Sequence, residues 1–500
     1  MYACGPTVYD YPHIGNYRAY LFEDLLRRYL EYRGYEVKMV MNITDVDDKT
    51  IAASGGKKAE LKKLTTKYEN DFMEGLKTLN VKPADEYPRA FETVDEMVVL
   101  IERLIEKGAA YQTDDGSVYF SIEKYAEYGK LVHLKPEEMK AGERVSDDDY
   151  EKEGARDFAL WKSWKEEDGE IYWETPLGKG RPGWHIECSA MSMKYLGEQL
   201  DLHCGGVDNI FPHHENEIAQ SEAATGKQFV KYWVHCEHLI LEGEKMSKSL
   251  GNIKLLKDLI GDGYSPEAIR LALLSTHYRS KLDLTEAKLK EAEGNARRIK
   301  DFRFAMGRVI KQEKPEPLRD AVNLIGEKLI EVSKGGDEID SILKDGQGRF
   351  EEGLDDDLNI SKAMAAIFDM MNDIYKLRDS GVLRKDGARK AMDKYNKFRE
   401  VIGIPVPGLS FRSSKENIEF VERGQYLRKE KKGDEIDEIR KQHPRVIFRL
   451  SPEVEELVIK RENLREAEKW DEADEIRKQL LREGIILEDT PDGTIVKFPM

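Results

Sequence analysis

The chain has 500 residues, a formal net charge of −17 at pH 7 and 35% charged side chains. This length predicts about three domains, and this charge excludes nonspecific nucleic-acid binding by bulk attraction to phosphates. Four scattered cysteines are too few for a disulfide framework, and there is neither an apolar run of ~18 residues nor a secretory signal pattern, which indicates a cytoplasmic protein without a membrane partner.

The first predicted elements lie within residues 1–44. Apolar side chains recur at helical spacing and Gly34 supplies a stop, which predicts a helix from about Gly15 to Arg33. Alternating apolar residues then predict a strand over residues 37–43. A strand, loop, helix and strand in this order are the building block of a parallel α/β sheet.

The loop of residues 4–16, CGPTVYDYPHIGN, joins the first strand to this helix. Ligands bind to open α/β sheets at the carboxyl ends of the strands, where free N–H groups of a helix N-terminus attract phosphate. His13 and Asn16 flank Gly15 and would add side-chain donors at the same place. The loop therefore predicts a phosphate-binding site.

The next segments predict a cover for the sheet and an insertion. Residues 55–108 are rich in Lys and Glu and carry helical apolar spacing, as expected of helices packed on a sheet. Short strand patterns separated by turns follow from residue 109 to about residue 155. We interpret residues 109–155 as an α+β insertion into the first domain.

The stretch of residues 183–220 concentrates metal-ligand chemistry. It contains two cysteines, four histidines, several carboxylates and a Gly-Gly-x-Asp turn. Thiolate, imidazole and carboxylate are the ligands of zinc, and adjacent glycines allow a small polar molecule to approach the backbone closely. The stretch predicts a metal centre beside a ligand pocket.

Three ligands of this centre can be chosen from spacing. Pro212 suits the first turn of a helix, so His213 and Glu217, four residues apart, would share one helix face. Together with Cys188 they leave a fourth position open. Cys204 is the nearest candidate in the sequence, and Cys4 is the candidate across the sheet; residue spacing does not decide between them.

A second basic loop follows within residues 231–252. Lys245, Ser247, Lys248 and Ser249 lie between a strand-like segment and a later helix. Two lysines and two hydroxyl groups on a loop can neutralise a polyphosphate whose charge develops in a transition state.

The remainder of the chain is predicted to be mostly helical. Ser265 and Pro266 open a helix, and residues 358–377 have the pattern of a bundle helix. Residues 411–447 are dense in charge. The final segment predicts two helices, a stop at Gly484 and a hairpin turning at 491–493.

Two loops together resemble the signatures of a known family. His13-Ile14-Gly15-Asn16 resembles the HIGH signature, and Lys245-Met246-Ser247-Lys248-Ser249 resembles the KMSKS signature, of class I aminoacyl-tRNA synthetases. With CGPTVYD, GRPGWHIECSAM and FPHHENEIAQSEA, they resemble cysteinyl-tRNA synthetases over residues 1 to about 410 and again over about 450–497. The resemblance implies ATP-dependent attachment of L-cysteine to cysteine tRNA through a cysteinyl adenylate. It also implies one Zn²⁺ per chain, Mg²⁺ with ATP, and a monomer.

The resemblance also implies roles for individual residues. The zinc ligands would be Cys4, Cys188, His213 and Glu217, with Cys204 at a position where members vary. ATP would contact Gly5, His13, Gly15, Asn16, Gly206, Asp208 and Lys248. The groups that stabilise the transition state would be His13, Asn16, Lys245 and Lys248, and the amino-acid pocket would be lined by Thr44 and Trp184. The zinc would distinguish cysteine from serine, because a soft thiolate binds zinc and a neutral hydroxyl does not.

The implied architecture has four parts. A Rossmann-like catalytic domain would occupy residues 1–250, with an insertion, at 109–155, that is too short to be an editing domain. A stem-contact region would follow at 251–310, directly after the KMSKS-like loop. A helical bundle that binds tRNA would span 311–410, and residues 411–500 would hold the charged insertion and a small anticodon-binding unit.

The sequence departs from the family pattern in two ways. Asn16 replaces the last histidine of the HIGH signature and keeps a hydrogen-bond donor, so we expect reduced pH sensitivity at most. Family members usually begin well upstream of the residue that corresponds to Met1, and we expect an upstream in-frame extension to raise stability and zinc retention.

Two other functions remain open. One is the related cysteine ligase of mycothiol biosynthesis, which shares the catalytic core and zinc site but lacks the long carboxyl-terminal region. The other is a catalytically inactive, zinc-stabilised tRNA-binding paralogue. The segment around Trp470, which resembles an anticodon-binding unit, disfavours the first, and the presence of His13 and Lys248 disfavours the second.

Overall fold

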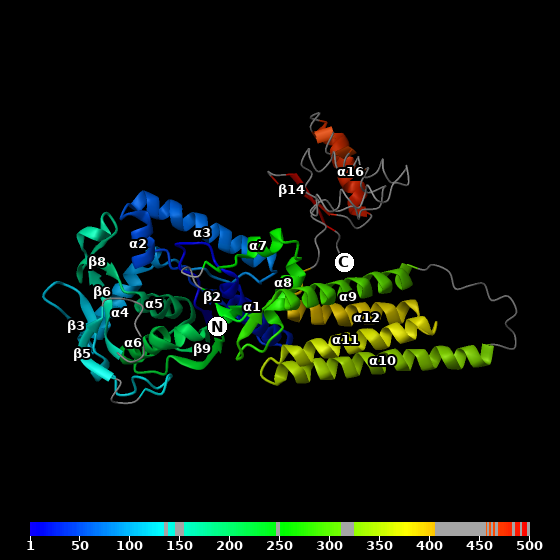
Figure 1. Ribbon diagram of the computed structural model, residues 1–500, viewed down its shortest axis with the longest axis horizontal. Coiled ribbons are helices and arrows are strands. Elements are labelled where there is room, and N and C mark those ends of the chain that lie inside the picture. Colours follow the sequence, from blue (N-terminus) through cyan, green and yellow to red (C-terminus); the bar gives the residue numbers. More distant parts are fainter. Residues whose placement is uncertain are drawn as a thin grey trace. The chain divides into compact units, whose positions relative to one another are not determined.

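The computed structural model describes residues 1–134, 139–145, 155–246, 251–311 and 325–405, and shorter stretches between 457 and 497 (Figure 1). The chain divides into two compact units, Met1–Ile404 and Pro405–Met500. Within the described stretches, no helix has the length and apolar character needed to cross a bilayer.

A parallel four-stranded sheet forms the centre of the first unit. Its strands, in the order β10-β9-β1-β2, are Val230–Cys236 (β10), Leu200–Gly206 (β9), Tyr2–Ala3 (β1) and Val40–Met41 (β2). Helix α1, Ile14–Tyr32, joins β1 to β2 and confirms the predicted strand, helix and strand. The second strand is shorter than predicted, because the two residues of β1 pair only with Val40 and Met41.

Both faces of the sheet are buried. On one face, α1 packs with Cys204 and Cys236 in a core that extends into the later helices. On the other, Tyr2 and Cys188 belong to a separate core. That second core includes α4 (Val94–Glu106), α5 (Trp184–Leu196) and α6 (Glu215–Thr225). Helices on both faces are the arrangement expected of a parallel α/β sheet, so the α/β fold class is confirmed.

The insertion is a mixed sheet at one end of this unit (Figure 1). Its path is β3-β4-β6-β8-β7, with β5 paired to β6. The strands are Ala110–Gln112 (β3), Val118–Phe120 (β4), Met139–Val145 (β5), Ala155–Ser163 (β6), Trp173–Thr175 (β7) and Gly178–Pro182 (β8). The sheet extends beyond residue 155, where the predicted insertion ended: Trp161 of β6 lies opposite Pro182 of β8.

A small sheet and two short helices follow the four-stranded sheet. They are β11 (Leu239–Leu241), β12 (Glu244–Lys245), β13 (Leu282–Leu284), α7 (Leu256–Gly261) and α8 (Pro266–Leu274). The predicted start of α8 is confirmed: Ser265 Oγ accepts a hydrogen bond from the Ala268 N–H at 3.3 Å, and Pro266 occupies the first turn. This cap satisfies a backbone donor that the helix itself leaves unpaired.

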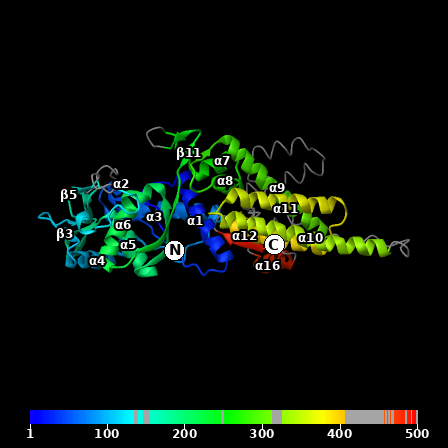
Figure 2. The same ribbon diagram turned by 90° about the horizontal axis from the view of Figure 1, so that it is seen from below.

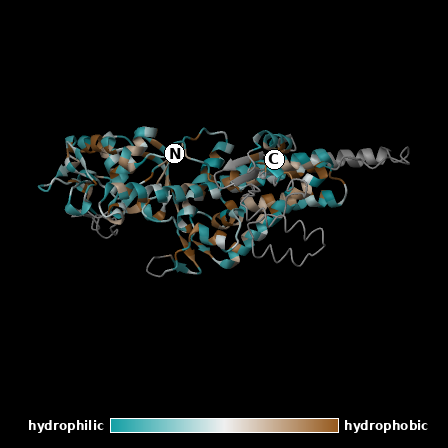
Figure 3. Cartoon of the chain, turned by 90° about the horizontal axis from the view of Figure 1, so that it is seen from above, coloured by the Kyte–Doolittle hydropathy of each residue, from teal (hydrophilic) through white to brown (hydrophobic). Residues whose placement is uncertain are grey.

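Four long helices complete the first unit and run side by side (Figures 1 and 2). They are α9 (Glu286–Lys311), α10 (Ile325–Asp355), α11 (Ile360–Asp379) and α12 (Lys385–Ile402). Figure 3 shows hydrophilic and hydrophobic residues side by side along the helical part of the chain, as expected of amphipathic helices. Phe350 and Phe398 stack in their core with ring centroids 4.2 Å apart.

The second unit contains a helix and a hairpin. Helix α16, Trp470–Arg482, presents buried Ala473, Ile476 and Leu480. Strands β14 (Ile486–Thr490) and β15 (Gly493–Lys497) pair antiparallel, which confirms the predicted hairpin. The charged segment 411–447 and Gly484 lie outside the described residues.

Candidate active site and metal centre

A cavity of about 1090 Å³ opens at the carboxyl ends of β1, β9 and β10. Of the residues singled out in the sequence, those that line it are Cys4, Gly5, His13, Gly15, Asn16, Thr44, Trp184, Cys188, Gly206, Asp208, His213 and Lys245. Glu217 lies beside His213 with its side chain fully buried. Lys248 lies outside the described residues. Loops far apart in the sequence therefore meet in one cavity.

Four potential metal ligands meet at one end of this cavity. One ligand atom from each of Cys4, Cys188, His213 and Glu217 lies within 4.8 Å of the others. The Cys4 and Cys188 Sγ atoms are 4.0 Å apart, His213 Nε2 is 3.4 Å from Cys188 Sγ, and His213 Nε2 is 3.1 Å from Glu217 Oε1. Two thiols, an imidazole and a carboxylate at this separation match a zinc donor set.

The turn that carries His213 leads directly into α6. Within Ile210–His214, Phe211 has φ −137° and ψ 133° and interrupts the helical path, which resumes at Pro212. The turn then continues into α6 at Glu215. Pro212 therefore stands in the first helical turn, as predicted, and His213 and Glu217 lie next to each other.

A second group of possible ligands overlaps the first. It consists of Cys4, His203, His214 and Glu217 and shares Cys4 and Glu217 with the first group. His214 Nε2 lies 3.3 Å from Cys4 Sγ, and His203 Nε2 lies 3.0 Å from Glu217 Oε2. The shared residues mean that one ion would occupy one group or the other.

Hydrogen bonds around the cluster favour the first group. His203 Nε2 contacts Glu217 Oε2, and His185 Nδ1 lies 3.1 Å from His213 Nδ1. In each of these two ligands, the atom that faces away from the cluster therefore has a polar partner. Glu217 Oε1 is buried and accepts no hydrogen bond from any described residue, although His213 Nε2 is close to it. Outer partners that hold the far atoms of ligands are typical of metal sites, and an orphaned buried oxygen is satisfied when a cation binds.

The structure separates Cys204 from the cluster. Cys204 is fully buried in the core shared with α1, whereas its neighbour His203 points to the opposite face, toward Glu217. Successive side chains of a strand face opposite sides of its sheet, so a cysteine directly after His203 cannot join it. Cys4 therefore has the better position for the ligand that residue spacing left open.

Electrostatics prepare one thiolate for a cation. The hydrogen bond from Cys4 lowers the pKa of Cys188 well below its usual value despite burial, and His213 adds to this effect. Burial and the neighbouring Cys188 thiolate raise the pKa of Cys4. Burial lowers the pKa of His185 and His214, so these imidazoles are neutral. Neutral imidazole and thiolate are the forms that bind metal.

His13 and Asn16 form the N-terminal cap of α1. The Asn16 N–H donates to His13 Nδ1 at 3.3 Å, and the His13 N–H donates to Asn16 Oδ1 at 3.0 Å. Because Nδ1 accepts this bond, a neutral His13 carries its proton on Nε2. The cap therefore sets the tautomer of the side chain that was predicted to donate to phosphate.

The segment after the KMSKS-like loop packs directly on this cap. The Ile14 N–H donates to the Lys254 carbonyl at 2.8 Å. A side chain at Gly15 would meet Met246 Cε at 2.9 Å, so glycine allows the two loops to approach. Lys245 is exposed at the end of β12, and Asn252 Nδ2 donates to its carbonyl at 3.1 Å. Residues within the KMSKS-like loop and just after it therefore contact the HIGH-like loop.

Thr44 and Trp184 line the same cavity. Thr44 Oγ1 donates to Glu187 Oε2 and accepts from Asn42 Nδ2, each at 3.1 Å. The Trp184 ring stacks on His213 with centroids 4.1 Å apart. A substrate bound at the cluster would therefore meet an aromatic wall and an oriented hydroxyl group.

Gly5 provides a test of this packing. Its N–H donates to Asn42 Oδ1 at 2.8 Å, and a Cβ atom there would overlap the Asn42 carbonyl oxygen. We expect Gly5→Ala to lower the free energy of unfolding by about 1–3 kcal/mol and to weaken metal retention by displacing Cys4. Thermal unfolding and metal analysis check this, with Gly294→Ala, where a Cβ meets nothing within 4 Å, as the control. Equal stability and metal content in the two variants would contradict it.

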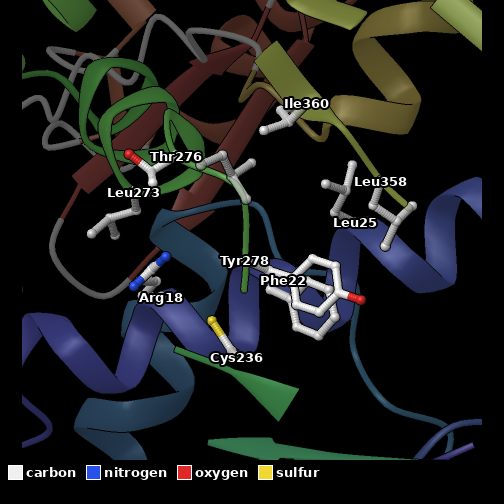
Figure 4. Close-up of a pocket in the computed structure, with 10 residues that line it drawn as sticks. Arg18, Phe22, Leu25, Cys236, Leu273, Thr276, Tyr278, Leu358 and Ile360 are labelled. Atoms are coloured by element: carbon white, nitrogen blue, oxygen red, sulfur yellow. The ribbon is translucent and has the colours of Figure 1, made fainter. Parts of the chain in front are cut away.

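A much smaller void is lined by residues of α1, α8 and β10, among others (Figure 4). Its volume is about 10 Å³, which is room for one water molecule at most. Arg18 borders it and donates to the carbonyl oxygens of Glu237 and Ser280 at 2.6 and 2.5 Å. This void is a packing feature and too small for a substrate.

The residues that sequence reasoning missed are three histidines that contact the cluster and one partner of Thr44. His185, His203 and His214 contact the cluster, and Glu187 accepts a hydrogen bond from Thr44. All four lie in the histidine-rich stretch, but their roles depend on which face of a strand or helix they occupy. The signal available in the sequence was the concentration of four histidines within residues 183–220.

Family comparisons agree with this geometry. Residues 1–294 match the family described as the class I (C) tRNA synthetase catalytic domain. Residues 349–406 match the DALR domain, and residues 449–496 match the cysteinyl-tRNA ligase anticodon-binding domain.

Individual relatives extend the match along the chain. The chain is 44% identical over 448 residues to the cysteine–tRNA ligase of Protochlamydia amoebophila, a match that covers 88% of each chain. It is 44% identical to the cysteine–tRNA ligase of Brachyspira hyodysenteriae, with 88% of this chain and 90% of the relative covered.

Solved structures share the fold at low sequence identity. Methionyl-tRNA synthetase of Mycobacterium tuberculosis in complex with methionyl-adenylate is 17% identical, with a TM-score of 0.53, covering 81% of this chain and 90% of that one. The agnB2 LeuRS of Agrobacterium radiobacter K84, solved with tRNA and LeuAMS, is 11% identical, with a TM-score of 0.55, covering 81% and 84%.

Proposed function

The chain belongs to the cysteinyl-tRNA synthetases, a family of class I tRNA synthetases, and from this premise we propose how its residues attach L-cysteine to tRNA. Its activity is ATP-dependent aminoacylation of tRNA with cysteine. The observation that carries this assignment is the family match across residues 1–294, which contain the whole described cavity.

The metal centre would hold Zn²⁺ through Cys4, Cys188, His213 and Glu217. The fit rests on the donor chemistry, the lowered pKa of Cys188 and the orphaned Glu217 oxygen. When bound, the ion would supply a soft Lewis acid that takes a thiolate and leaves a neutral hydroxyl unbound. The side chains around it would do the rest of the selection, with Trp184 and Thr44 closing the pocket around a small amino acid.

The first reaction step would take place between this pocket and α1. A carboxylate oxygen of cysteine attacks the α-phosphorus of Mg²⁺-bound ATP, and the bond to pyrophosphate breaks. His13, donating from Nε2, Asn16 and the free N–H groups of α1 would bind the phosphates, with Gly5 and Gly15 allowing close approach and Gly206 and Asp208 bordering the nucleoside. Lys245 and Lys248 would neutralise the leaving pyrophosphate.

The second step would transfer the cysteinyl group to tRNA. The 2′-OH of the terminal adenosine attacks the adenylate carbonyl, and AMP leaves with the bonding electrons. No strong protein base is required, because positioning and charge neutralisation supply most of the acceleration. The helical bundle and the carboxyl-terminal unit would bind other parts of cysteine tRNA.

We propose that the protein acts in the cytoplasm as a monomer. Cys4, Cys188, Cys204 and Cys236 are all free thiols in the structure, and metal binding by Cys4 and Cys188 needs a reducing compartment. Neither location nor assembly affects the chemistry of the two steps.

Charging of cysteine tRNA by the purified protein tests the assignment. The expected result is tRNA carrying cysteine, formed only with ATP present. Cysteine-dependent pyrophosphate exchange without tRNA charging would point instead to the cysteine ligase of mycothiol biosynthesis, and tRNA binding without exchange would point to an inactive paralogue. Either outcome would overturn the proposed function.

A further inference from the structure

Glu23 is a buried carboxyl group that has no part in the metal centre or in the proposed steps. It lies in the middle of α1, is 1% exposed and lines the large cavity. Neither of its oxygens has a hydrogen-bond partner among the described residues. Its neighbour Asp24 is equally buried but is bonded to Arg28, Arg270 and the Lys82 N–H. A buried polar group without a partner is costly, so Glu23 calls for an explanation that Asp24 does not.

The position of Glu23 indicates which substrate it would meet. Asn16, Tyr20 and Glu23 follow one another at helical spacing along the side of α1 that lines the cavity. Glu23 therefore lies below the N-terminus of α1, on the face of the sheet that carries Cys204 and Cys236. The metal cluster adjoins the core of the opposite face, through Cys188. Because Glu23 shares the side of α1 that begins with Asn16, the nucleotide is the substrate that we consider for it.

Cavity neighbours agree with this placement. Glu23, Cys236 and Asp208 all line the large cavity. In its charged form Glu23 would raise the pKa of Cys4, Cys204 and Cys236, so its carboxyl group lies near the carboxyl ends of β1, β9 and β10.

The charge state of Glu23 limits what it can bind. Burial raises its pKa well above the usual carboxyl range, which favours the neutral acid over the carboxylate. Neighbouring guanidinium groups of α1 are engaged elsewhere: Arg18 donates to backbone carbonyl oxygens of residues 237, 238, 277 and 280, and Arg27 pairs with Glu31 and Asp85. A neutral carboxyl group has one O–H donor and one carbonyl acceptor side by side, and it does not repel a triphosphate as a carboxylate would.

We propose that Glu23 recognises the nucleoside of ATP at the floor of the cavity, donating one hydrogen bond to it and accepting one from it. This inference rests on the proposed function for the identity of the nucleotide. The groups on a nucleoside that offer such pairs are the amino edge of the base and the ribose hydroxyls. Without ATP the carboxyl group has no hydrogen-bond partner among the described residues, so it lowers the stability of the ATP-free protein. When ATP is bound, the same group increases the affinity for the nucleotide.

Three variants test the proposal, with the dissociation constant of ATP measured directly by calorimetry. Glu23→Leu removes both hydrogen bonds and is expected to weaken ATP binding about tenfold while raising the melting temperature of the free protein by about 2–4 °C. Glu23→Gln keeps a donor beside an acceptor and is expected to retain ATP affinity within about threefold. Asp24→Asn is the matched control on the same helix, expected to lower the melting temperature and to leave ATP affinity intact.

ATP analogues identify the group that Glu23 contacts. Analogues that lack the base amino group, the 2′-hydroxyl or the 3′-hydroxyl are compared on the wild type and on Glu23→Leu. One of them is expected to lose affinity for the wild type and not for the variant. Unchanged ATP affinity in Glu23→Leu, or a Gln variant as weak as the Leu variant, would overturn the proposal. Direct binding does not depend on tRNA charging, so this outcome is separate from a failure of the proposed function.

Discussion

Replacing Cys188 by serine is expected to remove the metal and to lower cysteine-dependent ATP–pyrophosphate exchange at least about 100-fold. Cys188 is the group whose pKa is lowered most plainly toward the thiolate form, and its Sγ lies 3.4 Å from His213 Nε2. A serine hydroxyl at this position stays protonated and is a poor zinc ligand. Metal content by atomic spectroscopy and exchange rates on the same preparations check the prediction.

Cys204→Ser is the matched control for this experiment. Cys204 is another fully buried cysteine, in neither group of possible ligands. We expect this variant to retain metal and exchange activity within about threefold of the wild type, at some cost in stability. Because Cys188 belongs to only one of the two overlapping groups, metal retained by Cys188→Ser would assign the ion to His203 and His214 instead.

Replacing Arg270 by leucine is expected to lower the free energy of unfolding of the first unit by about 3–5 kcal/mol. The Arg270 side chain is fully buried and donates to Asp24 Oδ2 at 2.5 Å, to the Ile402 carbonyl at 2.7 Å and to the Leu79 carbonyl at 2.9 Å. Gly403, at φ +69°, approaches the guanidinium so closely that any Cβ there would overlap it. Leucine would remove the buried guanidinium that pairs with the Asp24 carboxylate.

Chemical denaturation measures this effect. Arg349→Leu serves as the control, because Arg349 pairs with Asp369 at 2.5 Å but both side chains are about half exposed. Exposed ion pairs contribute about 0–1 kcal/mol, so this variant should change stability little. A loss in Arg270→Leu no larger than in Arg349→Leu would show that the buried junction between α1, α8 and the end of α12 does not hold these elements together.

Most of the elements that were predicted correctly from the sequence follow from local periodicity. The helix from Gly15, the start of α8 at Pro266 and the carboxyl-terminal hairpin all follow from spacing and turn chemistry within one segment. Pro212 marked the first helical turn before Glu217 correctly, but the break in the helical path at Phe211 was not predicted. The reach of the insertion sheet to Pro182 was not predicted either, because it depends on pairing between distant strands.

The candidate site was predictable in its residue types more than in its arrangement. Spacing brought His213 and Glu217 together, but only the resemblance to a family favoured Cys4 over Cys204. Their separation follows from β1 and β9 lying side by side, with Cys204 turned toward α1. The orienting roles of His185 and His203, and the missing partners of Glu23, appear only once burial and side-chain directions are known.

The most direct test of thiol selection by the metal centre compares cysteine with serine as substrates in ATP–pyrophosphate exchange by the zinc-loaded protein. We predict exchange with cysteine and a preference over serine of at least about 10³ in kcat/KM, more than the ~10² that pocket shape alone achieves between near-isosteric side chains. Comparable exchange with serine, or none with cysteine, would contradict the claim that the cluster of Cys4, Cys188, His213 and Glu217 selects a thiol.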